Sequence, residues 1–150
     1  MSKEVVLPQE IKALGNRVIG CAIEVHRHLG PGLLEKLYEE ALVYELNASG
    51  LQTEQQVALA VPYKATVLRG QRVDLLVERS IVIEVKAVLE VHEVFAAQCL
   101  SYLRAGDWPL GLMNFHARTL RDGLKRICNE RWTGSPRPQP LSSLSSSSSL

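Results

Sequence analysis

The sequence predicts a mixed α/β (α+β) domain, because the spacing of its apolar residues changes along the chain. Up to residue 50 they recur at three- and four-residue steps, which is typical of amphipathic helices. From residue 51 to 88 they alternate or run continuously, which is typical of strands. A third helical pattern and another apolar strand follow. This order favours a layered fold with one mixed central sheet flanked by helices.

The chain has 150 residues, of which 46% are hydrophobic and 22% charged, as expected for one globular domain with a buried core. No apolar run approaches the ~18 residues of a membrane span, and the N-terminus lacks the pattern of a secretory signal. We therefore expect a cytoplasmic protein. The cysteines, Cys21, Cys99 and Cys128, form no CxxC pair, which argues against a disulfide framework or a zinc knuckle.

Two helices are expected first. One covers residues 8–29, with Pro8 near its first turn and Gly30-Pro31-Gly32 as its end. The second helix follows with one apolar face, and "NASG" at residues 47–50 is expected to end it. That face would consist of Leu34, Leu37, Ala41 and Tyr44.

The strands are expected on either side of Pro62, at 56–61 and 64–68, with residues 69–71 as a hairpin turn. Residues 72–77 and 81–87 form a second strand pair around a turn at 78–80. A third helix is expected over 93–104 and a buried strand over 109–115, whereas residues 118–132 fit either a helix or a strand. The domain would span 1–132, and the Pro/Ser-rich tail 133–150 is expected to be disordered.

The net charge is +1, so composition gives no overall signal for nucleic-acid binding. Residues 101–132 carry six Lys/Arg against three Asp/Glu, and such a basic face can contact phosphates or simply be solvated. The chain has no long basic arm. Affinity for a nucleic acid would then depend on a homodimer or a protein partner.

Three charges interrupt the apolar strand pair at 72–87, namely Asp74, Glu84 and Lys86. Side chains alternate across a strand, so Glu84 and Lys86 share one face. Residues equidistant from Arg79 face each other across a three-residue turn, which places Asp74 opposite Glu84. Two facing carboxylates repel, and one would take up a proton unless a cation lay between them. The strand pair therefore predicts a cation site.

Mg²⁺ suits such a site because it prefers oxygen ligands and is commonly held by one or two carboxylates with waters and phosphates. Lys86 would stabilise negative charge on a phosphorus or orient the attacking water. A plainer alternative is that Glu84 and Lys86 form a same-face ion pair while Asp74 caps a turn. The histidines offer no competing site, since His26 and His28 lie about 200° apart on a helix.

The acid on one strand and the Glu-x-Lys on the next resemble the PD-(D/E)xK nuclease superfamily, with Val73 in place of the proline. Residues 32–38, "GLLEKLY", are similar to the G-x-x-E-x-x-Y motif of the GxxExxY proteins, a branch of that superfamily. Downstream, "QCLSY" resembles the Q-x-x-x-Y motif of its helicase-associated members. The likeness covers roughly residues 10–128 and implies a restriction-endonuclease-like core.

The resemblance also implies roles for individual residues. Asp74, Glu84 and the backbone carbonyl of Val85 would bind metal, Mg²⁺ with Mn²⁺ as a substitute, and Lys86 would be catalytic. Glu35 corresponds to the acid that an early helix often supplies, directly or through water. Gln98 and Tyr102 would position the site or the substrate, although two residues one helical turn apart can simply bond each other.

The leading functional hypothesis is a metal-dependent nuclease that acts on phosphodiester bonds, more readily in DNA. The main alternative is a non-catalytic module that keeps the fold and binds nucleic acid or protein. An enzyme for some other phosphate substrate is a third reading. The intact Asp74, Glu84 and Lys86 favour the nuclease.

Overall fold

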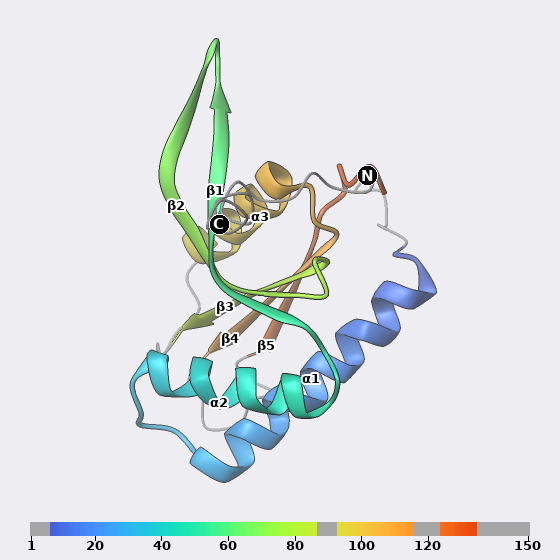
Figure 1. The fold of residues 1–150 in the computed structure, drawn as a ribbon, viewed down its shortest axis with the longest axis vertical. Helices are drawn as coiled ribbons and strands as arrows, with labels where there is room; N and C mark the ends of the chain where they lie inside the picture. Colours follow the sequence, from blue (N-terminus) through green and yellow to red (C-terminus); the bar gives the residue numbers. More distant parts are fainter. Residues whose placement is uncertain (1–6, 87–92, 116–123, 135–150) are drawn as a thin grey trace, which may run out of the picture.

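The computed structural model describes residues 7–86, 93–115 and 124–134, and most of the predicted tail lies outside these ranges. A five-stranded mixed sheet lies between helices α1 and α2 on one face and α3 on the other (Figure 1). The predicted α/β class is therefore confirmed. In the described part of the chain, no helix combines the length and apolar character needed to cross a membrane.

Helix α1 spans Gln9–Leu29 and α2 spans Glu35–Ala48, close to the predicted ranges. The connection between them turns at Gly32, whose φ of 113° is readily adopted only by glycine. The Tyr38 hydroxyl closes this connection, because it donates to the Gly30 carbonyl and accepts the Leu33 N–H at 3.2 Å. Two residues of the G-x-x-E-x-x-Y motif thus fix where α2 begins.

The predicted apolar face of α2 is wrong for three of its four residues, since only Ala41 packs against the core. Its buried residues are Tyr38, Leu42 and Leu46, whereas Leu34 and Tyr44 are 75% and 72% exposed. Apolar side chains occur on two sides of this helix, so their spacing fits either face. The packing against α1 and the anchored Tyr38 ring decide which face is buried.

The remaining elements are strands β1 (Thr53–Tyr63), β2 (Thr66–Val77) and β3 (Ile81–Lys86), helix α3 (Glu93–Gly106), and strands β4 (Leu110–Phe115) and β5 (Leu124–Cys128). The sheet order follows the sequence, and all neighbours are antiparallel except β3 and β4. Helix α3 supplies the crossover that a parallel pair requires. The ambiguous segment after residue 118 forms a strand in its described part, β5.

The first hairpin differs from the prediction. Its turn lies between Tyr63 and Thr66, and Arg69-Gly70 lies inside β2. There the register shifts by one residue between Leu59 and Val61, and Gly70 has a φ of 109°. A glycine inside a strand often marks a β-bulge, which the sequence alone cannot distinguish from a turn.

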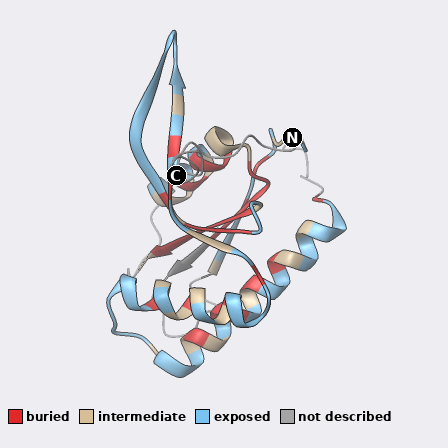
Figure 2. Cartoon of the chain, viewed as in Figure 1, coloured by how far each residue is buried: buried red, intermediate tan, exposed pale blue. Residues whose placement is uncertain are grey.

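The core consists of two clusters, one on each face of the sheet, and buried residues concentrate in these layers (Figure 2). Ile81, Ile83 and Val85 pack toward α1 and α2, whereas Val82 packs toward α3. Cys21 and Cys99 are buried as free thiols, as predicted, and Cys128 is exposed. The alternation along β3 places Glu84 on the α3 side of the sheet.

Candidate active site

The carboxylates of Asp74 and Glu84 lie where β2 and β3 diverge. Backbone pairing of these strands runs from Val77↔Ile81 to Leu75↔Ile83, and one more step in this register brings Asp74 opposite Glu84. The hairpin register is set by the short turn at Glu78-Arg79, as predicted.

Beyond the Leu75↔Ile83 pair, the carboxylates of Asp74 and Glu84 join the two strands by hydrogen bonds. Glu84 Oε1 accepts the Asp74 N–H at 3.2 Å, and Asp74 Oδ2 accepts the Val85 N–H at 2.9 Å. Each acid therefore bonds the backbone of the opposite strand. These bonds hold the two groups close together, but a backbone N–H carries no full charge to offset theirs.

The electrostatics of Glu84 reflect this arrangement. Its side chain is buried, with 5% of the residue exposed, in a layer of otherwise apolar residues. Burial, followed by the charge of Asp74, raises the pKa of Glu84 from its ordinary 4.5 to about 8. The Asp74 N–H and Lys86 oppose the rise and do not cancel it. The pair is therefore short of positive charge.

Lys86 lies at the end of β3 on the same side as Glu84 and is partly exposed. Its ammonium lies 5.4 Å from the centre of the Phe95 ring on α3. Among the described residues, no ion pair joins Lys86 to Glu84, which disfavours the plainer alternative of a same-face ion pair. Lys86 is thus held near the carboxylates without being neutralised by either.

Helix α3 brings Tyr102 to the site. Burial and the charges of Glu84 and Asp74 raise the pKa of Tyr102, so its hydroxyl lies within the field of both carboxylates. Gln71 Nε2 donates to this hydroxyl. Gln98 lies one turn earlier on α3 and is exposed, and no hydrogen bond links it to the site within the described residues. The contact to Gln71 could not be predicted, because it joins residues 31 positions apart.

Helix α2 carries two acids one turn apart, Glu35 at its first position and Glu39. Glu35 is exposed, whereas Glu39 is half-buried and accepts a hydrogen bond from Gln56 at 3.2 Å. Burial raises the pKa of Glu39, and the charge of Asp74 contributes to the rise. The structure therefore brings Glu39 toward Asp74. The motif spacing did not indicate Glu39 as a site residue.

These side chains fit a hard divalent cation. Two close carboxylates with incomplete charge compensation are the donor set that Mg²⁺ commonly uses, with water completing the shell. Within the described ranges, no group of three or more His, Cys, Asp or Glu side chains could hold a metal ion by itself. A cation here would therefore need ligands from backbone, water or substrate in addition to Asp74 and Glu84.

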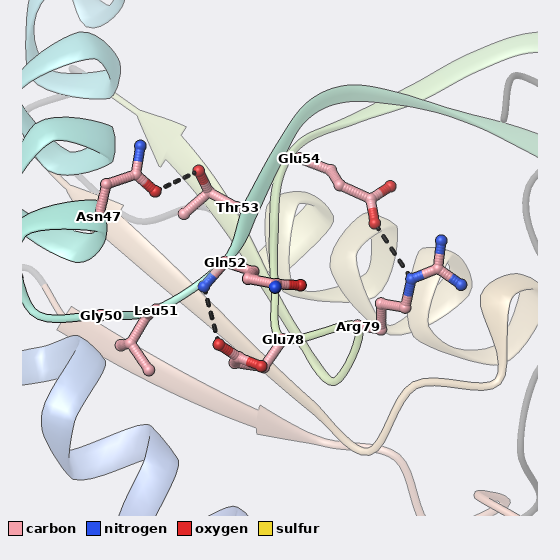
Figure 3. Close-up of a pocket in the computed structure, with 8 residues that line it drawn as sticks. All are labelled: Asn47, Gly50, Leu51, Gln52, Thr53, Glu54, Glu78 and Arg79. Atoms are coloured by element: carbon pink, nitrogen blue, oxygen red, sulfur yellow. Dashed lines mark hydrogen bonds and ion pairs between the residues drawn. The ribbon is translucent and has the colours of Figure 1, made fainter. Parts of the chain in front are cut away.

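A pocket of about 550 Å³ lies elsewhere, at the opposite end of the β2–β3 hairpin. Figure 3 shows its wall, where Gln52 donates to Glu78 at 2.7 Å and Arg79 pairs with Glu54 at 3.3 Å. These charged groups already have partners. We place the candidate site at Asp74 and Glu84, because their charges are not balanced.

Comparison with protein families gives a match to the PD-(D/E)XK nuclease superfamily over residues 12–127. The chain belongs to this superfamily. The matched range contains all of the acids discussed above, together with Lys86, Gln98 and Tyr102. No significant match was found among curated proteins or among solved structures. Membership supports a nuclease-like function and leaves the substrate and the metal to be argued from the residues.

Proposed function

We propose that this protein is a Mg²⁺-dependent nuclease that hydrolyses phosphodiester bonds in DNA. The observation that carries the proposal is the cross-strand pair of Asp74 and Glu84, held close by backbone hydrogen bonds and short of positive charge. Repulsion of this kind is relieved when a divalent cation binds between the two groups. The superfamily assignment supports the same chemistry.

Asp74, Glu84 and the Val85 carbonyl would hold Mg²⁺, or Mn²⁺ as a substitute, with Glu35 acting directly or through water. When bound, such an ion neutralises phosphate charge and lowers the pKa of water. The position of Glu39 near Asp74 adds it to the candidate ligands or to the residues that orient them.

The remaining residues act on the substrate. Lys86 would stabilise the charge that develops on the phosphate oxygens, because its ammonium is close to the carboxylates and unpaired with them. Tyr102 and Gln98 would position the substrate or the site from α3. The bond from Gln71 orients the Tyr102 hydroxyl for this task.

The motif at residues 32–38 supports placement in the GxxExxY branch. We further propose a cytoplasmic location and a nucleic-acid partner, with a homodimer or a protein partner contributing to affinity. The exposed apolar face of α2, with Leu34, Leu37 and Tyr44, supports such a contact.

Cleavage of supercoiled plasmid and of labelled DNA and RNA oligonucleotides, with Mg²⁺, Mn²⁺ or EDTA, tests the proposal. We expect metal-dependent DNA cleavage that Asp74→Ala and Glu84→Ala abolish and that Glu78→Gln, at the other end of the same strands, leaves intact. Calorimetric titration of Mg²⁺ into the same variants measures binding separately. Absence of both metal binding and cleavage would favour the non-catalytic module.

A second pair of variants distinguishes the two acids of α2. If Glu39 contributes to the metal site, Glu39→Gln should weaken Mg²⁺ binding by about 10–100-fold, as loss of an outer partner typically does. Glu40→Gln is the matched control, because Glu40 is exposed on the neighbouring position. Loss of affinity in Glu35→Gln but not in Glu39→Gln would restore the assignment from the motif.

A further inference from the structure

The β1–β2 hairpin extends beyond the sheet as an arm, defined here as residues 57–73 (Figure 1). Every residue from Pro62 to Arg72 is exposed, and the ribbon stands clear of the helices toward its tip (Figure 2). A two-stranded ribbon without support from other strands is only marginally stable in water. The length of the arm beyond the core therefore points to a partner outside the domain.

The base of the arm is fixed. Val57, Leu59 and Val73 are buried in the cluster around α3, and Gln71 bonds the Tyr102 hydroxyl. The arm is thus anchored to the same helix that borders the candidate site. It is a positioned element whose last residue, Val73, directly precedes Asp74.

The charge of the arm is one-sided. It carries Lys64, Arg69 and Arg72, and the sequence contains no Asp or Glu between Glu54 and Asp74. The arm is therefore +3 in a chain whose net charge is +1, so the rest of the chain is net negative. In the part of the chain that the structure describes, no ion pair joins these three cations to a carboxylate.

Lys64 lies in the turn, and Arg69 and Arg72 lie on β2 around the bulge, which is why no basic run is visible in the sequence. Arg72 alternates with Gln71, so it lies on the face of the ribbon turned away from α3. Along β2 it precedes Asp74 by two residues, a distance of about 7 Å or two nucleotide rises of DNA. A phosphate at Arg72 would therefore lie near Asp74 along β2.

We propose that the arm enters the major groove of double-stranded DNA and holds its phosphate backbone against Asp74 and Glu84. The inference rests on the proposed nuclease function and names its substrate as a duplex. Paired strands lie about 4.8 Å apart, and the B-DNA major groove, about 12 Å wide, admits such a ribbon. The major groove of an RNA duplex is deep and narrow and does not.

The chemistry of the arm favours DNA over a second copy of the chain. Tyr63, Val67 and Leu68 are exposed near the tip and could contact either partner. Two arms that met around a two-fold axis would bring two sets of cations together, which is unfavourable. A polyanion neutralises them, and the exposed Tyr63 ring beside Lys64 suits contacts with sugars or bases.

Binding measured without metal tests the inference separately from cleavage. Fluorescence anisotropy would follow a labelled 20-base-pair DNA duplex and the RNA duplex of the same sequence, in EDTA and at several salt concentrations. We expect Lys64→Ala, Arg69→Ala and Arg72→Ala each to weaken DNA binding several-fold. Each should also reduce the slope of log affinity against log salt by about one.

Two exposed cations outside the arm serve as matched controls, Lys12 on α1 and Lys125 on β5. Lys12→Ala and Lys125→Ala should bind DNA like wild type. The RNA duplex should bind more weakly and should respond little to the arm variants. Thermal melts that match wild type would show that each variant is folded, as expected for substitutions at exposed positions.

The inference is overturned if the arm variants bind DNA like wild type, or if Lys125→Ala reduces the salt slope instead. It is also overturned if the arm variants convert a dimer to a monomer in sedimentation without changing DNA affinity, which would make a second copy the partner. Arm effects on binding in a protein that never cleaves would reject the nuclease proposal alone. Cleavage lost in Asp74→Asn, with arm variants binding normally, would reject the arm alone.

Discussion

At the turn that joins β2 to β3, the described charged side chains have partners. Glu78 accepts the Gln52 N–H, and Arg79 pairs with Glu54. At the other end of the same two strands, Asp74 and Glu84 face each other, and each accepts a backbone N–H from the opposite strand, which carries no full charge. The two ends are about four residues apart along each strand. Charged side chains at the turn end have compensating partners, whereas the two carboxylates at the other end lie against each other.

The backbone shows the same contrast. Glu78 and Arg79 both have positive φ, at 49° and 53°, which is unfavourable for residues other than glycine. The hydrogen bonds around Glu78 and Arg79 support this tight turn, so these two charged residues have a structural role. Among the residues that the structure describes, Glu84 is buried with no cation paired to it. Charges that the fold accounts for are structural, and charges that it leaves unbalanced point to a missing partner.

The largest expected effect separates the two ends by activity. Lys86→Ala should reduce cleavage by about 10²–10³-fold while Mg²⁺ affinity stays near wild type, because an ammonium stabilises the transition state and is not a ligand. Arg79→Ala, which removes a cation from the turn end, should cleave like wild type. Single-turnover cleavage rates and calorimetry measure the two properties. A Lys86→Ala variant as fast as wild type would remove Lys86 from the mechanism.

The next effect concerns pH. The pKa of Glu84 is about 8 in the fold, above its ordinary 4.5, so the metal-free folded state keeps a proton that the unfolded chain releases. Stability should therefore fall as pH rises from about 4.5 to 8. Its slope should approach about 1.4 kcal/mol per pH unit within that window. Urea unfolding in EDTA at several pH values measures it.

Glu84→Gln should remove the part of this slope that Glu84 contributes, and Mg²⁺ should bind wild type more tightly as pH rises, because binding displaces the proton. Glu78→Gln is the control at the turn end and should keep the slope of wild type, since Glu84 remains. Equal slopes in Glu84→Gln and wild type would mean that Glu84 is ionised throughout and already compensated.

The sequence was sufficient to predict the register of the candidate site. The turn at Glu78-Arg79 is short, and the strands on either side are apolar, so a shift by one residue would turn buried side chains outward. Asp74 and Glu84 therefore had to face each other. The layered class followed as well, since the helical and strand periods are clear over most of the described chain.

The errors arose where local sequence fits two structures. Gly70 is compatible with a turn or a bulge, and only the pairing of β1 with β2 decides between them. Helix α2 is apolar on two sides, so its buried face depends on α1 and the Tyr38 contact. The roles of Glu39 and Gln71 could not be predicted from the sequence for a similar reason. Their neighbours Asp74 and Tyr102 lie more than 30 residues away, beyond any local pattern.

A smaller effect tests the repulsion directly. Asp74→Asn keeps an oxygen for the Val85 N–H and removes one of the two charges. Above about pH 8, where Glu84 is ionised as well, it should therefore stabilise the metal-free protein by about 0.5–2 kcal/mol. Wild type should gain stability from Mg²⁺, as any ligand of the folded state requires, and the variant should gain much less. Thermal melts in EDTA and in millimolar Mg²⁺ compare them. Destabilisation in EDTA with a normal metal response would make Asp74 structural.

The smallest effect is expected at the turn end, where the comparison predicts an ordinary surface ion pair. Arg79 and Glu54 are 3.3 Å apart, and their side chains are 44% and 37% exposed, so solvent screens their attraction. A double-mutant cycle with Arg79→Ala and Glu54→Ala should give a coupling of about 0–1 kcal/mol by urea unfolding. Cleavage should be unchanged in all three variants. A coupling well above this range would show that Arg79 and Glu54 are not an ordinary surface ion pair. Loss of cleavage would extend the functional site along the whole hairpin, and the contrast between its two ends would no longer identify the site.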